Sequence, residues 1–293
     1  MHHQPQPDDL LFHHLMKQQS SCSTQSPVIL LIALLLVFLP NLEVHASPVD
    51  DSAPASPLMA TANPDKERLK YNVSWLGMNA GLLSMRIEPA PNNPGDFFIK
   101  TEVTSSSFFA TLYPVKDKFE TLISGEQRLP IRYIFLQHEG FRRNRKQTHY
   151  DQENLQVTYR KNKKPPQTFQ VEEPVHNEFS SFLILRTLMF DSEDPIIVPT
   201  FADKKSHHVQ VINHGPETLK TMFGEIRTIK VEPRLTFKGL YEKTGSVMIW
   251  LTDDKYRIPV RIKSKITIGA LTAELYDYYR PGETPYSRKK TSP

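Results

Sequence analysis

The chain has 293 residues, a single cysteine and a formal net charge of +4 at pH 7. One cysteine cannot form an internal disulfide or supply a thiolate metal cluster, so both kinds of cysteine-rich domain are excluded. The length is sufficient for one large β-domain that is stabilised by burial alone.

The N-terminal residues have the features of a secretory signal. Residues 28–39 form an uncharged apolar run that ends at the helix breaker Pro40. The run is shorter than the roughly 20 residues that a membrane-spanning helix needs. Val44 and Ala46 suit the −3 and −1 positions of a cleavage site.

We therefore predict a signal peptide at residues 1–46, cleaved after Ala46, and a periplasmic location; an uncleaved N-terminal anchor is the alternative. Translation starts at Met1 or at Met16, and Met16 would give the more usual n-region. Cys22 is lost with the signal, which leaves no cysteine nucleophile in the mature chain. The mature chain keeps 35 basic and 29 acidic residues, a net charge of +6.

Composition divides the mature chain into three parts. Residues 47–66 are rich in Pro, Ala and Ser and predict a disordered linker, and residues 281–293 predict a disordered basic tail. Between them, residues 67–280 are predicted to form a single β-rich domain.

Alternation of apolar and polar residues dominates this domain, as is typical of half-buried strands. It begins at residues 69–75, turns at the glycine-flanked residues 77–81 and resumes at 83–87 as a hairpin. Further strands are predicted, in chain order, at residues 96–104, 117–124, 131–138, 145–150, 155–160, 168–171, 208–213, 226–231 and 246–251.

Two helices are predicted among the strands. Residues 177–190 begin with the N-cap Asn177 and are apolar around most of the helix, so this helix must be covered on several sides. A shorter helix is predicted at residues 106–113. We expect a mainly β fold, in which a large, curved, half-barrel-like antiparallel sheet packs on one main apolar helix.

The stretch that looks most like a site, residues 249–262, predicts a hairpin. Asp253 and Asp254 follow a strand that contains Trp250. Adjacent side chains of an extended segment point in opposite directions, so these two carboxylates cannot converge on one substrate atom. Arg257 and Pro259 then lead into the next strand, and the whole motif is interpreted as structural.

One long strand of about 35 Å is predicted from Ile258 to Ile268, because alternate residues stay apolar along it. The apolar face changes parity after Gly269, which predicts a β-bulge at Gly269 and Ala270. Long bulged strands favour a strongly curved sheet.

Two basic runs, residues 141–146 and 159–164, favour an anionic partner. A lipid headgroup or an anionic membrane surface is the expected partner, and nucleic acid is not. The candidate contact residues are Arg142, Arg143, Arg145 and Lys146. The alternative is a pair of solvated turns.

The other notable polar residues are interpreted as structural, and not as catalytic or metal-binding. Asp117 and Arg186 lie in apolar surroundings, and we expect them to form a buried ion pair. His208 and His214 would lie about 20 Å apart on one strand, too far apart to bind one metal ion. Phosphate-binding loops, nucleophile elbows and metalloprotease motifs are missing from the sequence. We therefore predict no cofactor, no metal and no catalytic residue.

A family resemblance extends over about residues 69–279. It rests on Tyr71-x-Val73-x-Trp75-x-Gly77 with Ala80-Gly81, Tyr113-Pro114-Val115-x-Asp117, Gly140-x-x-Arg143, Ser180 with Arg186, Glu217 with Gly224, Val231-x-Pro233, and Trp250-Leu251-Thr252-Asp253-Asp254 with Arg257-Ile258-Pro259-Val260 and Gly269. The sequence resembles the bacterial exported family called domain of unknown function 3108. The resemblance implies an exported, mostly antiparallel β-protein of Gram-negative bacteria and brings no established activity.

Three functions remain open, and the sequence favours the first. It is a non-enzymatic cell-envelope protein whose curved sheet and apolar helix hold a lipid or another apolar small molecule. The second is an envelope hydrolase with a site assembled from distant strands. The third is a protein-binding module in envelope assembly. The ligand, the oligomeric state and any further role of Asp253 and Asp254 stay open.

Overall fold

The computed structural model describes residues 66–91, 93–124, 128–190, 195–235, 246–266 and 268–281. The predicted signal peptide with its cleavage site, and nearly all of the predicted linker and basic tail, lie outside the described residues.

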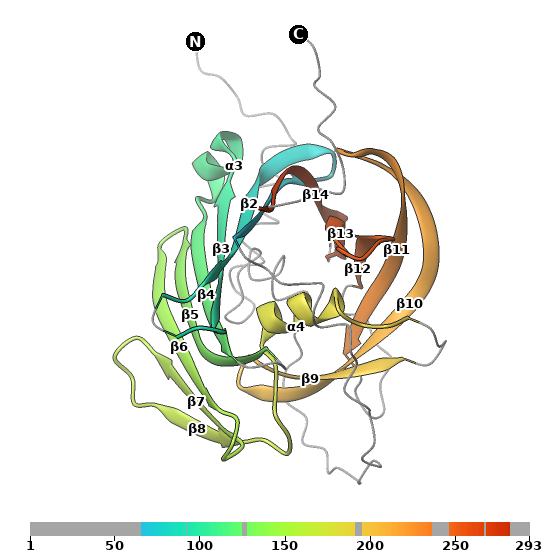
Figure 1. Cartoon of the computed structure of the whole chain (residues 1–293). Coiled ribbons are helices and arrows are strands. Elements are labelled where there is room, and N and C mark those ends of the chain that lie inside the picture. The colour runs from blue at the N-terminus through green and yellow to red at the C-terminus, as the bar shows by residue number, and fades with distance from the viewer. Residues whose placement is uncertain are drawn as a thin grey trace, which may run out of the picture.

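Within these described ranges, fourteen strands form one antiparallel sheet (Figure 1). They are β1 (Glu67–Trp75), β2 (Met78–Pro89), β3 (Phe97–Ser105), β4 (Lys116–Ser124), β5 (Leu129–Glu139), β6 (Arg142–Asp151), β7 (Gln156–Lys161), β8 (Gln167–Gln170), β9 (Ile196–Ala202), β10 (Lys205–Thr221), β11 (Gly224–Leu235), β12 (Val247–Thr252), β13 (Pro259–Lys265) and β14 (Ala270–Tyr279). Their order across the sheet is β8-β7-β6-β5-β4-β3-β2-β1-β14-β13-β12-β11-β10-β9. The prediction of a mainly β fold with a large curved antiparallel sheet is confirmed.

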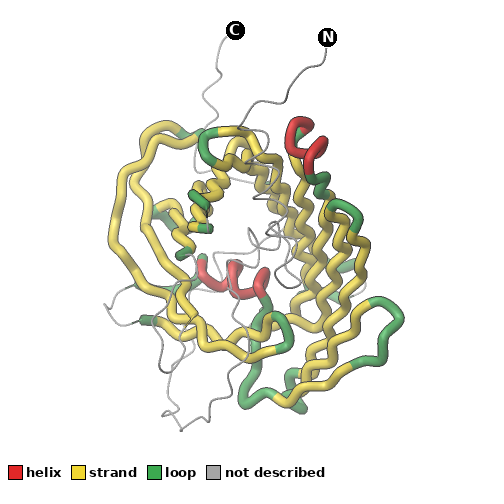
Figure 2. Tube along the Cα trace, turned by 180° about the vertical axis from the view of Figure 1, so that it is seen from behind, coloured by secondary structure: helices red, strands yellow, loops and turns green. Residues whose placement is uncertain are grey.

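The first and last strands pair with each other in the middle of the sheet. The β1–β14 register runs from Arg68 opposite Tyr279 to Trp75 opposite Leu271, with a bulge after Lys70. Two meanders extend from this pair, β1 to β8 on one side and β14 back to β9 on the other. The sheet curves so that both meanders wrap around helix α4 (Glu178–Leu185), which lies inside the curve (Figures 1 and 2).

The segment between β8 and β9 joins the two ends of the sheet. The backbone N–H of His176 donates to the carbonyl of Pro199 (2.9 Å), and the N–H of Phe201 donates to the carbonyl of His176 (2.8 Å). The Phe201 side chain is buried in a small core with residues of β6, β7 and the segment after β8, namely Tyr150, Val157, Val171 and Val175. These contacts hold the curved sheet nearly closed.

Helix α4 is shorter than predicted, because the expected helix at residues 177–190 ends at Leu185. Asn177 is the N-cap, and its Oδ1 accepts from the backbone N–H groups of Phe179 (3.1 Å) and Ser180 (2.9 Å). At the other end, the Thr187 hydroxyl donates to the carbonyl of Ile184 (2.8 Å), which satisfies a terminal backbone acceptor. The short helix α3 (Ser107–Leu112) agrees closely with its prediction.

The interior is aliphatic on one side and aromatic on the other. Inward side chains of β1 to β3 and β12 to β14 are fully buried, among them Leu69, Ile87, Ile99, Ile249 and Leu251. On β4 and β5, Phe119 stacks on Phe135 at 4.3 Å between ring centres, and Phe119 contacts Phe179 of α4 at 5.2 Å. Both described helices are too short to span a bilayer.

The predicted strand from Ile258 to Ile268 is wrong. Strand β13 ends at Lys265, and the chain turns at Gly269 into β14, where the N–H of Ile266 donates to the carbonyl of Gly269 (3.2 Å). Gly269 has a φ of 78°, and a Cβ at this position would lie 2.5 Å from the Leu76 side chain. The change of parity at Gly269 therefore marks a hairpin turn and not a bulge.

Two strands on one side of the sheet also differ from prediction. Strand β9 was not predicted, because Pro199 and Thr200 interrupt its apolar alternation. Strand β10 has 17 residues, whereas residues 208–213 were predicted. Its second half is mostly polar and follows a register shift between Asn213 and Pro216, so it gave no period-two signal.

Candidate functional site

The conspicuous carboxylates of the hairpin β12–β13 shape its turn. The Asp254 Oδ1 accepts from the backbone N–H groups of Tyr256 (2.7 Å) and Arg257 (3.2 Å) and from the Thr252 hydroxyl (3.0 Å). Asp253 instead pairs on the surface with Arg227 (2.7 Å) and Arg257 (3.5 Å). The two carboxylates have separate partners, and Arg257 has a positive φ of 47° that these bonds help to hold.

We expect Asp254→Ala to lower the free energy of unfolding by about 2–3 kcal/mol, because three hydrogen bonds of a half-buried turn lose their acceptor. Asp253→Ala is the matched control and should cost under about 1 kcal/mol, since it breaks only exposed ion pairs. Urea titration of both variants would measure the difference. Equal destabilisation would show that Asp254 has no special part in the turn.

Trp250 and Pro259 flank this turn and also have structural roles. The Trp250 indole N–H donates to Glu217 (3.1 Å), while Lys230 and Arg261 lie over its ring at 5.4 and 5.8 Å. The Pro259 carbonyl accepts from the buried hydroxyl of Tyr71 (2.8 Å), next to a register shift between β12 and β13.

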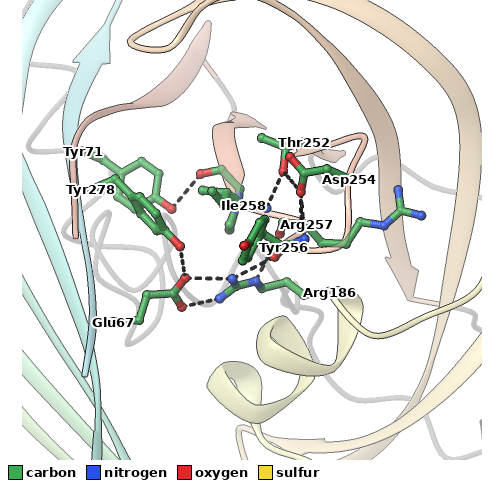
Figure 3. Close-up of polar contacts among 10 residues, drawn as sticks. Glu67, Tyr71, Arg186, Thr252, Asp254, Tyr256, Arg257, Ile258 and Tyr278 are labelled. Carbon is green, nitrogen blue, oxygen red and sulfur yellow. Dashed lines mark hydrogen bonds and ion pairs between the residues drawn. The ribbon is translucent and has the colours of Figure 1, made fainter. Parts of the chain in front are cut away.

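The turn also contributes to a buried ion pair of Arg186 and Glu67 (Figure 3). The Arg186 Nη1 and Nη2 donate to the two Glu67 oxygens at 2.5 and 2.8 Å. Its Nε and Nη2 also donate to the carbonyls of Arg257 (3.1 Å) and Tyr256 (3.0 Å). The Tyr278 hydroxyl donates to Glu67 at 2.7 Å. The expected pairing of Arg186 with Asp117 is wrong.

Electrostatics agrees with a structural role for this pair. Burial opposes the charge on Glu67, but the charge and hydrogen bonds of Arg186 outweigh it and hold the pKa of Glu67 below its usual value. Burial likewise disfavours the charged Arg186, and Glu67 raises the Arg186 pKa. Both side chains are at most 3% exposed. A fully partnered, sealed pair can fasten α4 to β1 and to the β12–β13 turn, but it offers nothing to a ligand.

Asp117 lies instead beside a second acid, Glu139. Both are fully buried, on β4 and on β5. The Asp117 Oδ1 accepts from the N–H of His138 (2.7 Å), and Gln137 donates to Glu139 (3.0 Å). Burial, a hydrogen bond to Glu139 and its charge raise the pKa of Asp117 to about 9. The carboxyl group of Asp117 is therefore protonated at neutral pH, next to Glu139.

The four basic residues predicted to contact a partner are divided between two faces of β6. Lys146 pairs with Phe135 across the β5–β6 ladder and lies over its ring at 5.0 Å, so it points into the curve of the sheet. Arg142 has the same parity as Lys146. Arg143 and Arg145 alternate with them, are exposed and point outwards. They therefore do not form one contact surface.

Lys146 belongs to a group that we call the polar interior cluster, defined by the inward residues Lys146, Tyr133, Tyr159 and Glu178. All four are half-buried although they face the inside of the sheet. The Lys146 ammonium has no hydrogen bond and no ion pair within 4.0 Å among the described residues. The Glu178 Oε2 is sealed from solvent and likewise has no hydrogen-bond partner there.

The ionisable groups of this cluster have shifted pKa values. Burial raises the pKa of Glu178 to about 7. Burial lowers the pKa of Lys146, although the charges of Asp203, Glu178 and Glu139 partly oppose it. Burial and then Asp203 raise the pKa of Tyr159 to about 12. Interior groups that lack a hydrogen bond and have perturbed pKa values make this cluster a candidate ligand or active site.

The histidines do not form a site. His208 Nε2 contacts Glu173 (2.9 Å), and His214 Nε2 contacts Glu232 (2.9 Å), so each has its own partner. Within the described ranges there is no group of three or more His, Cys, Asp or Glu residues that could bind a metal ion.

Three acidic residues of the interior were not expected from the sequence, namely Glu67, Glu139 and Glu178. Glu67 and Glu178 each begin an element, where an acid is usually solvated or favours the helix dipole. Glu139 did have a usable signal, because it shares its parity on β5 with the buried Phe135 and Gln137.

The comparisons with known proteins concern family and fold. The family model described as "Protein of unknown function (DUF3108)" matches residues 70–276. Among proteins with curated descriptions, none matches. A solved β-barrel-like protein of domain of unknown function DUF1849 from Brucella abortus is similar in fold, with a TM-score of 0.52 and 8% identity over 73% of this chain and 97% of that chain.

Two further structures have TM-scores too low to carry an argument. One is a protein with a YmcC-like fold from Bacteroides fragilis, with a TM-score of 0.32 and 12% identity over 74% of this chain and 97% of its own. The other is a hypothetical protein from Chlamydia trachomatis, with a TM-score of 0.33 and 7% identity over 79% and 96%.

Proposed function

The chain belongs to the family of proteins of unknown function DUF3108, which assigns it no activity, and we propose that it is an exported, non-enzymatic protein of the cell envelope that binds an amphipathic molecule inside its curved sheet. The observation that carries the proposal is the polar interior cluster. Its Lys146 ammonium and the Oε2 atom of Glu178 face the interior and have no hydrogen bond and no ion pair within 4.0 Å among the described residues, although the ammonium lies over the ring of Phe135.

Such groups cost free energy in a folded protein unless something else satisfies them. A buried polar atom without a hydrogen bond destabilises the fold by about 1–3 kcal/mol. Arg186 and Glu67, in the same interior, show that this chain can satisfy buried charges completely. The contrast supports a bound polar group at Lys146 and Glu178.

The rest of the interior favours an apolar remainder on the same molecule. Phe119, Phe135 and Phe179 pack beside the cluster, and aliphatic side chains of the neighbouring strands β1 to β3 continue the same apolar interior. A ligand with a polar end and a hydrocarbon part matches this division. Lys146 would donate to its polar end, and Glu178, with a pKa of about 7, can donate when protonated and accept when ionised.

The test is native mass spectrometry, with lipid extraction, of the exported protein purified from the periplasm. We expect a co-purifying amphiphile in the wild type and a loss of occupancy of about tenfold in Lys146→Met, which keeps the length of the side chain and removes its charge. Arg145→Met is the matched control, because it removes one charge from the outer face of the same strand.

A ligand-free mass from well-folded wild-type protein would contradict the proposal, and so would equal occupancy in Lys146→Met and Arg145→Met. An envelope hydrolase is the second candidate, since a carboxyl group that titrates near pH 7 could act as a general base. Under that alternative the wild type would release a cleaved amphiphile and Glu178→Gln would retain the intact one.

A further inference from the structure

Alternate turns of an antiparallel meander lie at the same end of the sheet. The turns β1–β2, β5–β6, β7–β8 and β13–β14 therefore share one end with α3, which connects β3 to β4. Figures 1 and 2 show α3, the β5–β6 turn and the β7–β8 turn following one another along this edge of the molecule. We call it the α3 end.

Direct contacts bring these turns together. The Trp75 ring, just before the β1–β2 turn, lies 5.9 Å from the ring of Phe109 in α3, and its indole N–H donates to the carbonyl of Ile268 in the β13–β14 turn (2.8 Å). The N–H of Gly140 in the β5–β6 turn donates to the carbonyl of Pro114 after α3 (2.8 Å). The α3 end is therefore one connected surface.

Large apolar side chains project from this end into solvent. Of the eleven exposed large hydrophobic residues in the described part of the chain, six lie here, in four separate connections: Leu76, Met78, Phe108, Leu112, Phe141 and Ile268. Phe141, at the tip of the β5–β6 turn, is 106% exposed, and Phe108 of α3 is 63% exposed. Among the described residues of the turns at the opposite end, none is an exposed large hydrophobic residue.

Positive charge surrounds the apolar tips. Lys116 and Arg143 are exposed beside α3 and the β5–β6 turn, and Lys163 and Lys164 are exposed in the β7–β8 turn. Asp117 and Glu139, in this region, are fully buried, and the raised pKa of Asp117 keeps its carboxyl group protonated at neutral pH, so this pair adds little negative charge to the surface. Asp203, in the β9–β10 turn, is an exposed acid at this end.

We propose that the α3 end docks on an anionic lipid bilayer, with Phe108 and Phe141 inserted among the headgroups and the basic residues close to lipid phosphates. Isolated apolar side chains on projecting turns, surrounded by Lys and Arg, suit a lipid bilayer, because the fluid headgroup region can surround each inserted side chain. A protein partner would instead require one continuous apolar patch with good shape complementarity. This docking goes beyond the proposed ligand binding and does not depend on it.

The test is co-sedimentation of the exported protein with phosphatidylcholine vesicles that contain or lack phosphatidylglycerol. We expect binding only to the anionic vesicles, weakened by salt. Phe108→Ser/Phe141→Ser should weaken it by about tenfold, since both side chains already lie in water and their removal should leave the fold intact. Lys163→Gln/Lys164→Gln should reduce both the affinity and its salt dependence.

Ile197→Ser/Tyr276→Ser is the matched control, because it removes two exposed apolar side chains from elsewhere on the sheet and should bind like the wild type. The proposal is overturned if the wild type does not bind anionic vesicles, or if the control loses as much affinity as Phe108→Ser/Phe141→Ser. Unchanged circular dichroism of each variant establishes that lost binding does not come from unfolding.

Discussion

Arg186→Met should lower the free energy of unfolding by about 3–5 kcal/mol, the usual cost of leaving a buried charge without its partner. Glu67 would keep the hydrogen bond from the hydroxyl of Tyr278 but lose those from Arg186. The carbonyls of Tyr256 and Arg257 would also lose the hydrogen bonds that the guanidinium donates. The effect should be large because Arg186 connects three parts of the molecule that are distant in sequence, namely the end of α4, strand β1 and the β12–β13 turn. Urea denaturation monitored by tryptophan fluorescence would measure it.

Two further variants separate charge from packing. In Glu67→Gln/Arg186→Met, the introduced amide would still accept from Tyr278 while the uncompensated charge is gone, so much of the lost stability should return. Arg68→Met, one residue along, breaks a half-exposed pair with Asp277 (3.3 Å) and a contact with the ring of Tyr279 (5.6 Å), and should cost about 1 kcal/mol or less. A double variant less stable than Arg186→Met alone would show that the cost is not electrostatic.

Asp117→Asn should remove much of the dependence of stability on pH. The pKa of Asp117 is raised from 3.8 to about 9 in the folded protein, mainly by burial and then by Glu139. Between these values the folded state binds a proton that the unfolded state has released, so wild-type stability falls as the pH rises, by about 1 kcal/mol per pH unit. Asparagine can keep the bond from the N–H of His138 and donate its amide to Glu139 without any proton uptake.

The variant should therefore be more stable than the wild type at pH 9, by at least about 2 kcal/mol, and the difference should shrink towards pH 4. A weaker slope between about pH 4.5 and 7 should remain, because Glu178 also has a raised pKa and binds its proton more tightly when folded. Asp277→Asn on the outer face of the sheet is the control and should keep the wild-type slope. An unchanged slope in Asp117→Asn would mean that the pKa of Asp117 is not raised in the folded protein.

The predicted curvature rested on a long bulged strand from Ile258 to Ile268, which the structure does not contain. Period-two alternation was sufficient to predict the sheet and most of its strands, because one face of each strand is buried. The alternation pattern failed to predict strands that are not buried on one face alone. The second half of β10 is mostly polar, and β9 is buried at three consecutive residues, Thr200 to Ala202, so neither strand leaves an alternating pattern. At Gly269 a bulge and a hairpin turn change the parity in the same way, so alternation alone could not distinguish them.

The candidate site was harder to predict than the fold. Lys146 looked like one more member of a basic run, because four cations within five residues are indistinguishable until the register of β6 places alternate residues on opposite faces. The ion-pair partner of Arg186 could not be predicted from the sequence for a different reason. Glu67 lies 119 residues earlier in the chain, and local sequence patterns carry no information about pairing over such a separation.

The pairing of β1 with β14 has a consequence for how the chain is completed. Glu67 and Tyr278, which meet across these two strands, are 211 residues apart, so the contact in the middle of the sheet closes a loop that contains nearly all of the described residues. A polypeptide that emerges from its N-terminus first can build the β1–β8 meander early, but one edge of β1 stays unpaired until the last strand arrives. During that interval the future centre of the sheet is an unpaired strand edge, which promotes aggregation. The pairing of β14 with β1 covers this edge and so removes the risk.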